Sequence, residues 1–149
     1  MITPQDGLSN AEKIHEFHDT VGAPLPRTPQ VPEAAHLQFR MKLIQEEFQE
    51  LFDEYNQLNG VIAQNGAVNV LDLQALLHEM ADLLYVTYGG IQACGVDADA
   101  LFAEIHRANL QKAGGPRRAD GKILKPEGWQ PADVTGVLHR LLNMRDQTG

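Results

Sequence analysis

Two stretches of this 149-residue chain decide its fold, LIQEEFQELFDEY at 43–55 and LLHEMADLLYVTYGG at 76–90. In the first, Ile44, Phe48, Leu51 and Tyr55 recur at the spacing of an amphipathic helix. The second is apolar almost throughout and is long enough for a helix but too charged for a membrane span. With no convincing strand run elsewhere, the sequence predicts an all-α fold.

The second stretch also carries two carboxylates, Glu79 and Asp82, one helical turn apart. A carboxylate in apolar surroundings must be paired, metal-bound or protonated, because its desolvation costs several kcal/mol, on the order of 5. No Lys or Arg lies between Leu43 and Arg107, so Glu79 and Asp82 have no lysine or arginine nearby on their own helix with which to form an ion pair. The pattern therefore favours a buried helix with a divalent cation as the partner of these two groups.

The first stretch repeats the theme with Glu46, Glu47 and Glu50, which lie within roughly a 100° arc beside the apolar stripe. A solvated acidic face is the alternative interpretation of such a pattern. Phe39 and Leu43 fall in the same arc, so this side of the helix is not simply solvent-facing. Carboxylate oxygens in this number suit Mg²⁺ or Mn²⁺ better than zinc.

We interpret the whole chain, 1–149, as one domain folded as a four- to five-helix bundle. Capping and turn residues mark where its helices begin and end. The segment 116–130 is basic and glycine-bearing, and could be a loop or a short hairpin around Asp120-Gly121. The predicted helices run from a Ser9 capping box to Gly22, from about Glu33 to Asn59 with Gly60 as the C-terminal cap, from about Asn69 to Gly95, from an Asp97 cap to about Lys112, and from Pro131 onward.

The composition excludes several functional classes. A net charge of −8 argues against binding to a nucleic acid polymer or to an anionic membrane. The one cysteine, Cys94, excludes an internal disulfide framework and is typical of a reducing compartment. Residues 1–6 lack the basic and apolar regions of a signal peptide. We therefore expect a soluble cytoplasmic protein.

The spacing of the carboxylates resembles a known signature. Glu46-Glu47-x-x-Glu50, the 28 residues 51–78, and Glu79-x-x-Asp82 are similar to the EExxE…ExxD pattern of the all-α nucleoside triphosphate pyrophosphohydrolases, which include MazG-like enzymes. The downstream segment also resembles a MazG-like subgroup, although Leu110-Gln111 departs from its usual Met-Ser. The segment comprises HRANLQK at 106–112, DGKILKP at 120–126 and GWQP at 128–131.

The resemblance implies hydrolysis of a nucleoside triphosphate, dUTP or a close relative, to the monophosphate and pyrophosphate. It implies a Mg²⁺ or Mn²⁺ cofactor, a role in cleaning the nucleotide pool, and an oligomer, either a dimer or a tetramer. We expect a homodimer, because the predicted helices offer more apolar surface than one small bundle covers. Glu47 projects toward the apolar flank, where poor solvation would raise its pKa, so we assign it as the general base. The metal ligands are then Glu46, Glu50, Glu79 and Asp82, and the groups that bind substrate are Asn109, Lys112, Lys122 and Lys125.

Two other classes of function stay open. A carboxylate-bridged di-iron bundle uses Glu-x-x-His pairs, and the chain has two, Glu12 with His15 and Glu33 with His36. Both pairs lie at least ten residues from the acidic clusters. The other class is a non-catalytic helical interaction protein, which would bind no metal.

Overall fold

The computed structural model describes residues 7–146, and within this range it contains five α-helices and one short 3-10 helix. The all-α class is thereby confirmed. Residues 1–6, on which the absence of a signal peptide was predicted, lie outside the described residues. The elements are α1 (Asn10–Thr20), α2 (Ala34–Asn65), η1 (Val70–Leu73), α3 (Gln74–Ala93), α4 (Ala98–Leu110) and α5 (Val134–Asp146).

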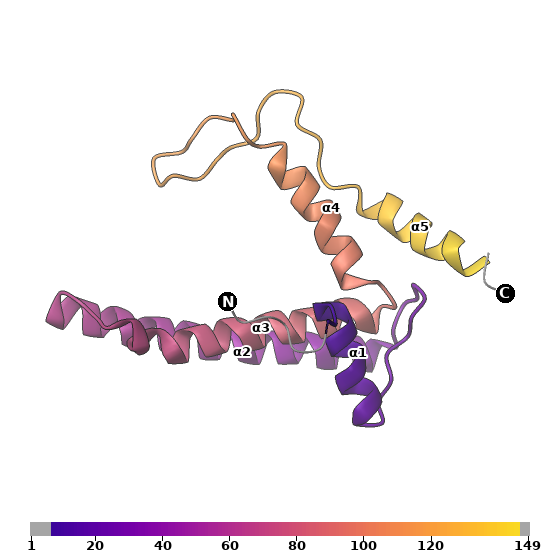
Figure 1. The fold of residues 1–149 in the computed structure, drawn as a ribbon, viewed down its shortest axis with the longest axis horizontal. Helices are drawn as coiled ribbons and strands as arrows, with labels where there is room; N and C mark the ends of the chain where they lie inside the picture. Colours follow the sequence, from indigo (N-terminus) through magenta and orange to yellow (C-terminus); the bar gives the residue numbers. More distant parts are fainter. Residues whose placement is uncertain (1–6, 147–149) are drawn as a thin grey trace.

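Helices α2 and α3 form a long antiparallel hairpin (Figure 1). The antiparallel direction follows from which residues meet. An added Cβ at Gly89 would lie 3.2 Å from Nη1 of Arg40 near the start of α2. Val61, near the end of α2, lines the same hollow as Leu76, which lies near the start of α3. The hairpin thereby brings the carboxylates of α2, Glu46, Glu47 and Glu50, beside those of α3, Glu79 and Asp82.

The other helices gather at the carboxyl end of α3. Helix α1 packs across this end, and α4 leaves from it, carrying the 111–133 loop at its far end from the hairpin (Figure 1). The buried apolar cluster lies here too, and its members are Ala11, Ile14, Leu25, Tyr88, Ala93 and Ala98. The hydrophobic core therefore fixes one end of the hairpin and leaves its middle open.

The expectation that residues 70–94 form a buried helix is wrong for the single chain. Leu77, Met80 and Leu84 are 54%, 48% and 49% exposed. Leu84 lines a hollow together with Ile14 of α1, whereas Leu77 and Met80 lie nearer the start of α3. Contiguous exposed apolar side chains of this kind are typical of interaction surfaces.

Side-chain caps confirm three of the predicted helix starts. Ser9 Oγ accepts from Glu12 N at 3.2 Å while Glu12 Oε2 accepts from Ser9 N at 2.6 Å, as a capping box requires. Asp97 Oδ1 accepts from the first amides of α4. Asn69 forms a capping box with Asp72, although it opens η1, and α3 begins only at Gln74.

Two predicted boundaries need correction. Helix α2 does not end at Gly60 but continues to Asn65, because Val61 still packs beside α3 and one helical glycine costs only about 1 kcal/mol. Gly66 is the cap, with φ +72°. Helix α5 begins at Val134 and not at Pro131, since Asp133 Oδ1 accepts from the Gly136 amide at 2.8 Å and so caps the helix there.

Candidate active site

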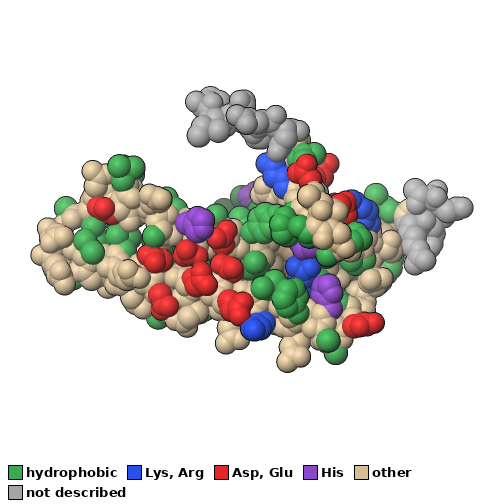
Figure 2. Space-filling model, turned by 90° about the horizontal axis from the view of Figure 1, so that it is seen from below, with side chains coloured by type: hydrophobic (Ala, Val, Ile, Leu, Met, Phe, Trp, Pro, Cys, Tyr) green, Lys and Arg blue, Asp and Glu red, His purple; other side chains and the backbone are tan. Residues whose placement is uncertain are grey.

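Three carboxylates meet in the middle of the α2–α3 hairpin. Glu47 and Glu50 lie one turn apart on α2, and Glu79 faces them from α3. One oxygen from each of the three lies within 4.8 Å of the other two. Glu47 and Glu79 are half-buried and Glu50 is exposed. Figure 2 shows acidic side chains gathered on this face of the hairpin, with hydrophobic side chains beside them.

The electrostatics of the cluster centre on Glu47. Burial raises the pKa of its carboxyl group, and four neighbouring negative charges raise it further. The expectation that poor solvation raises the pKa of Glu47 is confirmed. The four charges, from the largest effect to the smallest, are those of Glu50, Asp82, Glu79 and Glu46. The other four carboxylates selected from the sequence thus all lie close enough to Glu47 to act on it.

Glu46 and Asp82 stand at the edge of this cluster. Lys42 Nζ lies 3.5 Å from Glu46, and both side chains are largely exposed. Nε2 of His78 lies 3.0 Å from Asp82, one turn away on α3. The sequence reasoning counted only Lys and Arg as local partners and overlooked His78, whose contact with Asp82 is an ion pair when the imidazole is protonated. The assignment of Glu46 and Asp82 as metal ligands stays a prediction.

The chemistry of the three central carboxylates fits a hard divalent cation. Mg²⁺ binds oxygen at about 2.1 Å, so oxygens on opposite sides of the ion lie about 4.2 Å apart. Oxygens of Glu47, Glu50 and Glu79 lie within 4.8 Å of one another, which is close to this spacing. A bound cation would also offset the mutual repulsion that raises the pKa of Glu47.

The Glu-x-x-His pairs of the di-iron alternative do not join the carboxylates. Among residues 7–146, the cluster of Glu47, Glu50 and Glu79 is the one group of acidic, His or Cys residues with the spacing of a metal site. Glu12 is engaged instead in the cap of α1. The structure therefore gives no support to an iron site built on these pairs.

The predicted substrate-binding residues lie apart from the carboxylates, around the loop that joins α4 to α5. Lys112 Nζ donates to Asn109 Oδ1 at 2.6 Å, and the ammonium groups of Lys112 and Lys125 lie 5.4 Å and 4.4 Å from the centroid of the Trp129 ring. Trp129 is held by a bond from Nε1 to the Ala108 carbonyl oxygen at 2.8 Å. The structure thus brings Asn109, Lys112 and Lys125 together around one indole.

Lys122 belongs to a small hairpin on the same loop. An antiparallel bridge joins Arg117 to Ile123, and the Arg118 amide donates to the Lys122 carbonyl oxygen at 2.8 Å. Gly121 turns the chain with φ +89°. The hairpin considered for this segment is confirmed. Figure 1 shows that the whole segment lies away from the α2–α3 hairpin of the same chain.

A buried charged residue of α2, Arg40, escaped the sequence reasoning. Arg40 is 7% exposed and lies seven residues before Glu47, on the same face of α2. Its Nε donates to Nε2 of His36 at 3.1 Å, and its Nη2 lies 3.0 Å from Nε2 of His18. His18 Nδ1 lies 2.7 Å from the Ile14 carbonyl oxygen, so Nδ1 carries the proton and Nε2 accepts from Arg40. The available signal was the heptad spacing of Arg40 from Glu47.

Comparison with known proteins gives one match to a family. The family described as phosphoribosyl-ATP pyrophosphohydrolase matches residues 14–109, a segment that contains α2, α3 and all five carboxylates. No curated protein matches the chain. Within residues 7–146, no helix combines the length and the apolar character that crossing a membrane requires.

Proposed function

The chain belongs to the phosphoribosyl-ATP pyrophosphohydrolase family and is a nucleotide pyrophosphohydrolase, and we propose that it converts a nucleoside triphosphate to the monophosphate and pyrophosphate at the α2–α3 carboxylates. The observation that carries the proposal is the approach of Glu47, Glu50 and Glu79 to within 4.8 Å. A triphosphate is repelled by such a cluster unless a cation lies between them, so Mg²⁺ or Mn²⁺ belongs to the proposal.

We assign each carboxylate a role in the proposed reaction. Glu50 and Glu79, with Asp82 and Glu46 at the edge, hold the cation, which when bound neutralises charge on the phosphate oxygens and orients the attacking water. Glu47 is half-buried among them and accepts the proton of that water. Since Glu47 is also within 4.8 Å of Glu50 and Glu79, it has a competing role as a ligand that kinetics can separate.

The basic segment supplies the phosphate-binding side chains. Lysine offers a point charge and three donors to a phosphate and cannot ligate a metal. Because Lys112, Lys122 and Lys125 lie away from the carboxylates of their own chain, we propose that they serve the carboxylates of a second copy in a homodimer. The exposed apolar face of α3 supports this proposal, since a partner would cover it. Light scattering that gives a 16.5 kDa monomer at micromolar concentration contradicts the dimer.

Two substrates follow from different observations. The resemblance of the downstream motifs to dUTP-preferring MazG-like enzymes favours dUTP, and with it a cytoplasmic role in cleaning the nucleotide pool. The family match favours phosphoribosyl-ATP, which the name of that family specifies. Both substrates carry the same triphosphate, so the carboxylates treat them alike and the choice between them depends on what binds the rest of the molecule.

A substrate panel tests the proposal. The full chain is incubated with Mg²⁺ or Mn²⁺ and with each common ribo- and deoxyribonucleoside triphosphate, or with phosphoribosyl-ATP, and the products are resolved by phosphorus NMR. We expect dUTP to be cleaved fastest, to the monophosphate and pyrophosphate. Equal turnover of all triphosphates removes the dUTP preference, and release of a diphosphate with inorganic phosphate contradicts the reaction itself.

A further inference from the structure

The cations at the end of α4 and in the 111–133 segment divide into two groups. Arg107 and Arg118 are each bonded to a carboxylate through two of their nitrogens. Among residues 7–146, the ion pairs include neither Lys112 nor Lys125, and both ammonium groups lie over the Trp129 ring instead. A carboxylate cancels the charge of its partner toward other molecules, whereas an uncharged indole leaves that charge in place.

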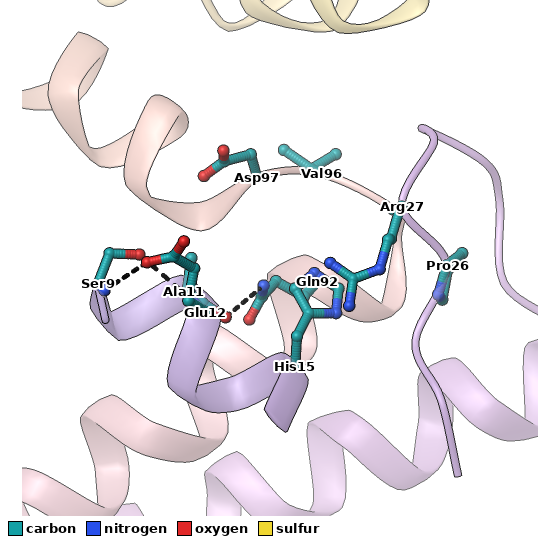
Figure 3. Close-up of a pocket in the computed structure, with 10 residues that line it drawn as sticks. Ser9, Ala11, Glu12, His15, Pro26, Arg27, Gln92, Val96 and Asp97 are labelled. Carbon is teal, nitrogen blue, oxygen red and sulfur yellow. Dashed lines mark hydrogen bonds between the residues drawn. The ribbon is translucent and has the colours of Figure 1, made fainter. Parts of the chain in front are cut away.

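The hollow beside the start of α1 provides a contrast, because its polar groups serve the fold. Figure 3 shows Gln92 of α3 there, and its Nε2 donates to the Ala11 carbonyl oxygen at 3.0 Å. Arg27, which lines the same hollow from the 23–32 connector, bonds to Asp19 at 3.2 Å. Bonds of this kind join helices and connectors to one another. The contacts of the two lysines with the indole leave two positive charges available to a ligand.

Trp129 is itself fixed at two points. Its Nε1 donates to the carbonyl oxygen of Ala108 at 2.8 Å, and Ala108 is a buried residue near the end of α4. Its backbone amide donates to the Pro126 carbonyl oxygen at 3.2 Å. The indole is therefore tied both to α4 and to its own loop, and it forms a fixed platform for two flexible lysine side chains.

The position of the ring limits where the two ammonium groups can lie. Their nitrogens are 5.4 Å and 4.4 Å from one centroid, so their separation cannot exceed the sum of these distances. A free lysine side chain loses rotamer entropy when it binds, and a contact that orders the side chain beforehand reduces this loss. Each ammonium has three donors, so contact with the ring leaves donors for phosphate oxygens. Lys112 gives one of its donors to Asn109 Oδ1.

We propose that Trp129 is a positioning residue whose ring face holds the ammonium groups of Lys112 and Lys125 in place for the phosphates of the substrate. The proposal rests on the proposed function, in which these lysines bind the phosphates. Trp129 lies outside residues 14–109, so the family match assigns it no role. Because the ring acts through the lysines, weakening it lowers affinity for the phosphates and leaves the chemistry at the carboxylates unchanged.

Fluorinated tryptophan tests the role of the ring directly, because Trp129 is the one tryptophan of the chain and an analogue replaces it alone. Fluorine withdraws electron density from the ring face and weakens its attraction for cations, while the Nε1–H donor remains. We expect the Kd for inorganic tripolyphosphate with Mg²⁺, measured by calorimetry on the full chain, to rise about two- to fivefold from tryptophan to a trifluorinated analogue. KM for dUTP should rise by the same factor, with kcat unchanged.

The double variant Lys112→Ala with Lys125→Ala is the matched control, since fluorination should have no effect without the two ammonium groups. Lys122→Ala removes a lysine that does not take part in the cation–π contacts of the described residues, and it should keep the full response to fluorination. Trp129→Phe keeps an aromatic face but lacks the bond to Ala108. It should therefore retain most of the affinity for tripolyphosphate that Trp129→Leu loses.

Failure of tripolyphosphate to bind, or binding that does not respond to fluorination, overturns the proposal. A response that persists in the double lysine variant overturns it as well. Equal losses in Trp129→Phe and Trp129→Leu would show that the hydrogen bond to Ala108 matters and the ring face does not. Tripolyphosphate binding that responds to fluorination, without dUTP hydrolysis, contradicts the catalytic proposal alone. Hydrolysis with a KM that fluorination does not change contradicts the role of Trp129 alone.

Discussion

The middle of the α2–α3 hairpin and the 111–133 segment carry opposite charges and are built in opposite ways. The hairpin holds its carboxylates on two long helices, where the backbone fixes the distances between them. The segment holds its lysines on a loop with one antiparallel bridge, arranged around Trp129. Metal ligands need a rigid geometry, whereas groups that bind a flexible phosphate chain tolerate adjustment. The difference is the one expected between a metal centre and a substrate clamp.

The largest expected effect on turnover is that of a substitution among the carboxylates of the α2–α3 hairpin. Glu50→Gln should weaken Mg²⁺ binding and reduce turnover by more than about a hundredfold, because it replaces one of three converging carboxylates by an uncharged amide. Metal titration by calorimetry and a steady-state assay measure the two effects. Asp53→Asn, which alters an exposed carboxylate of the same helix bonded to Gln49, is the matched control and should change neither. Normal metal binding and turnover in Glu50→Gln would show that the cluster is only a solvated acidic face.

Glu47→Gln should reduce the rate without reducing metal affinity, and this difference from Glu50→Gln sharpens the role of Glu47. As the general base, Glu47→Gln should lose about 10²–10⁴-fold in kcat while still binding Mg²⁺ with the nucleotide. As a ligand, it should instead lose metal affinity in proportion to rate. Mg²⁺ dependence of kcat and KM, with circular dichroism to verify the helices, decides between the two.

Changes in the basic segment should act on substrate affinity. Lys112→Ala and Lys125→Ala should each raise KM for the triphosphate by about tenfold, because a charged hydrogen bond to phosphate is lost. Affinity for Mg²⁺ alone should stay as it is. Lys112→Arg and Lys125→Arg keep the charge and should restore most of the loss. A fall in kcat without a change in KM would place these lysines elsewhere in the reaction.

The smallest expected effect is on the pH dependence of stability, and it concerns the contact between α4 and the end of the 111–133 segment. Glu104 on α4 accepts from Arg107 at 2.6 and 2.8 Å and from the Asp133 amide at 2.7 Å, and these bonds lower its pKa to about 2. A carboxyl whose pKa is lowered in the folded state adds stability above its ordinary pKa of 4.5. That contribution should be lost as the pH falls from 4.5 toward 2.

Denaturant unfolding followed by Trp129 fluorescence checks this dependence. Trp129 is a suitable probe because it bonds to Ala108 on the same helix as Glu104. Glu104→Gln should flatten the pH dependence in that window and leave turnover at neutral pH nearly unchanged. An unaltered pH profile in the variant would show that the bonds of Glu104 do not hold this contact.

Local patterns in the sequence placed pairs of carboxylates on one face of each helix. Residues three apart on a helix share a face, so the pairs Glu47–Glu50 and Glu79–Asp82 were placed without long-range information. Ser9 and Asp97 were recognised as caps for the same reason, since a cap depends on the next three residues. What a single turn of helix determines can be predicted from the sequence.

Features that depend on distant packing could not be predicted. Gly60 looked like a helix end, but packing against α3 outweighs its weak local preference. The bonds of Arg40 join α2 to α1 across the intervening connector, and no spacing within one helix announces them. The separation of Lys112 and Lys125 from the carboxylates is likewise set by the direction in which α4 leaves the core.

The central claim is that these two regions form one active site contributed by two copies of the chain. Mixing two impaired variants, Glu50→Gln and the double variant Lys112→Ala with Lys125→Ala, at a substrate concentration far below KM, where both turn over slowly, tests it by subunit exchange. If one copy supplies the carboxylates and the other the lysines, a two-fold symmetric mixed dimer keeps one intact site, and random pairing should restore about a quarter of the wild-type rate. Activity that never exceeds the sum of the separate variants would contradict the claim.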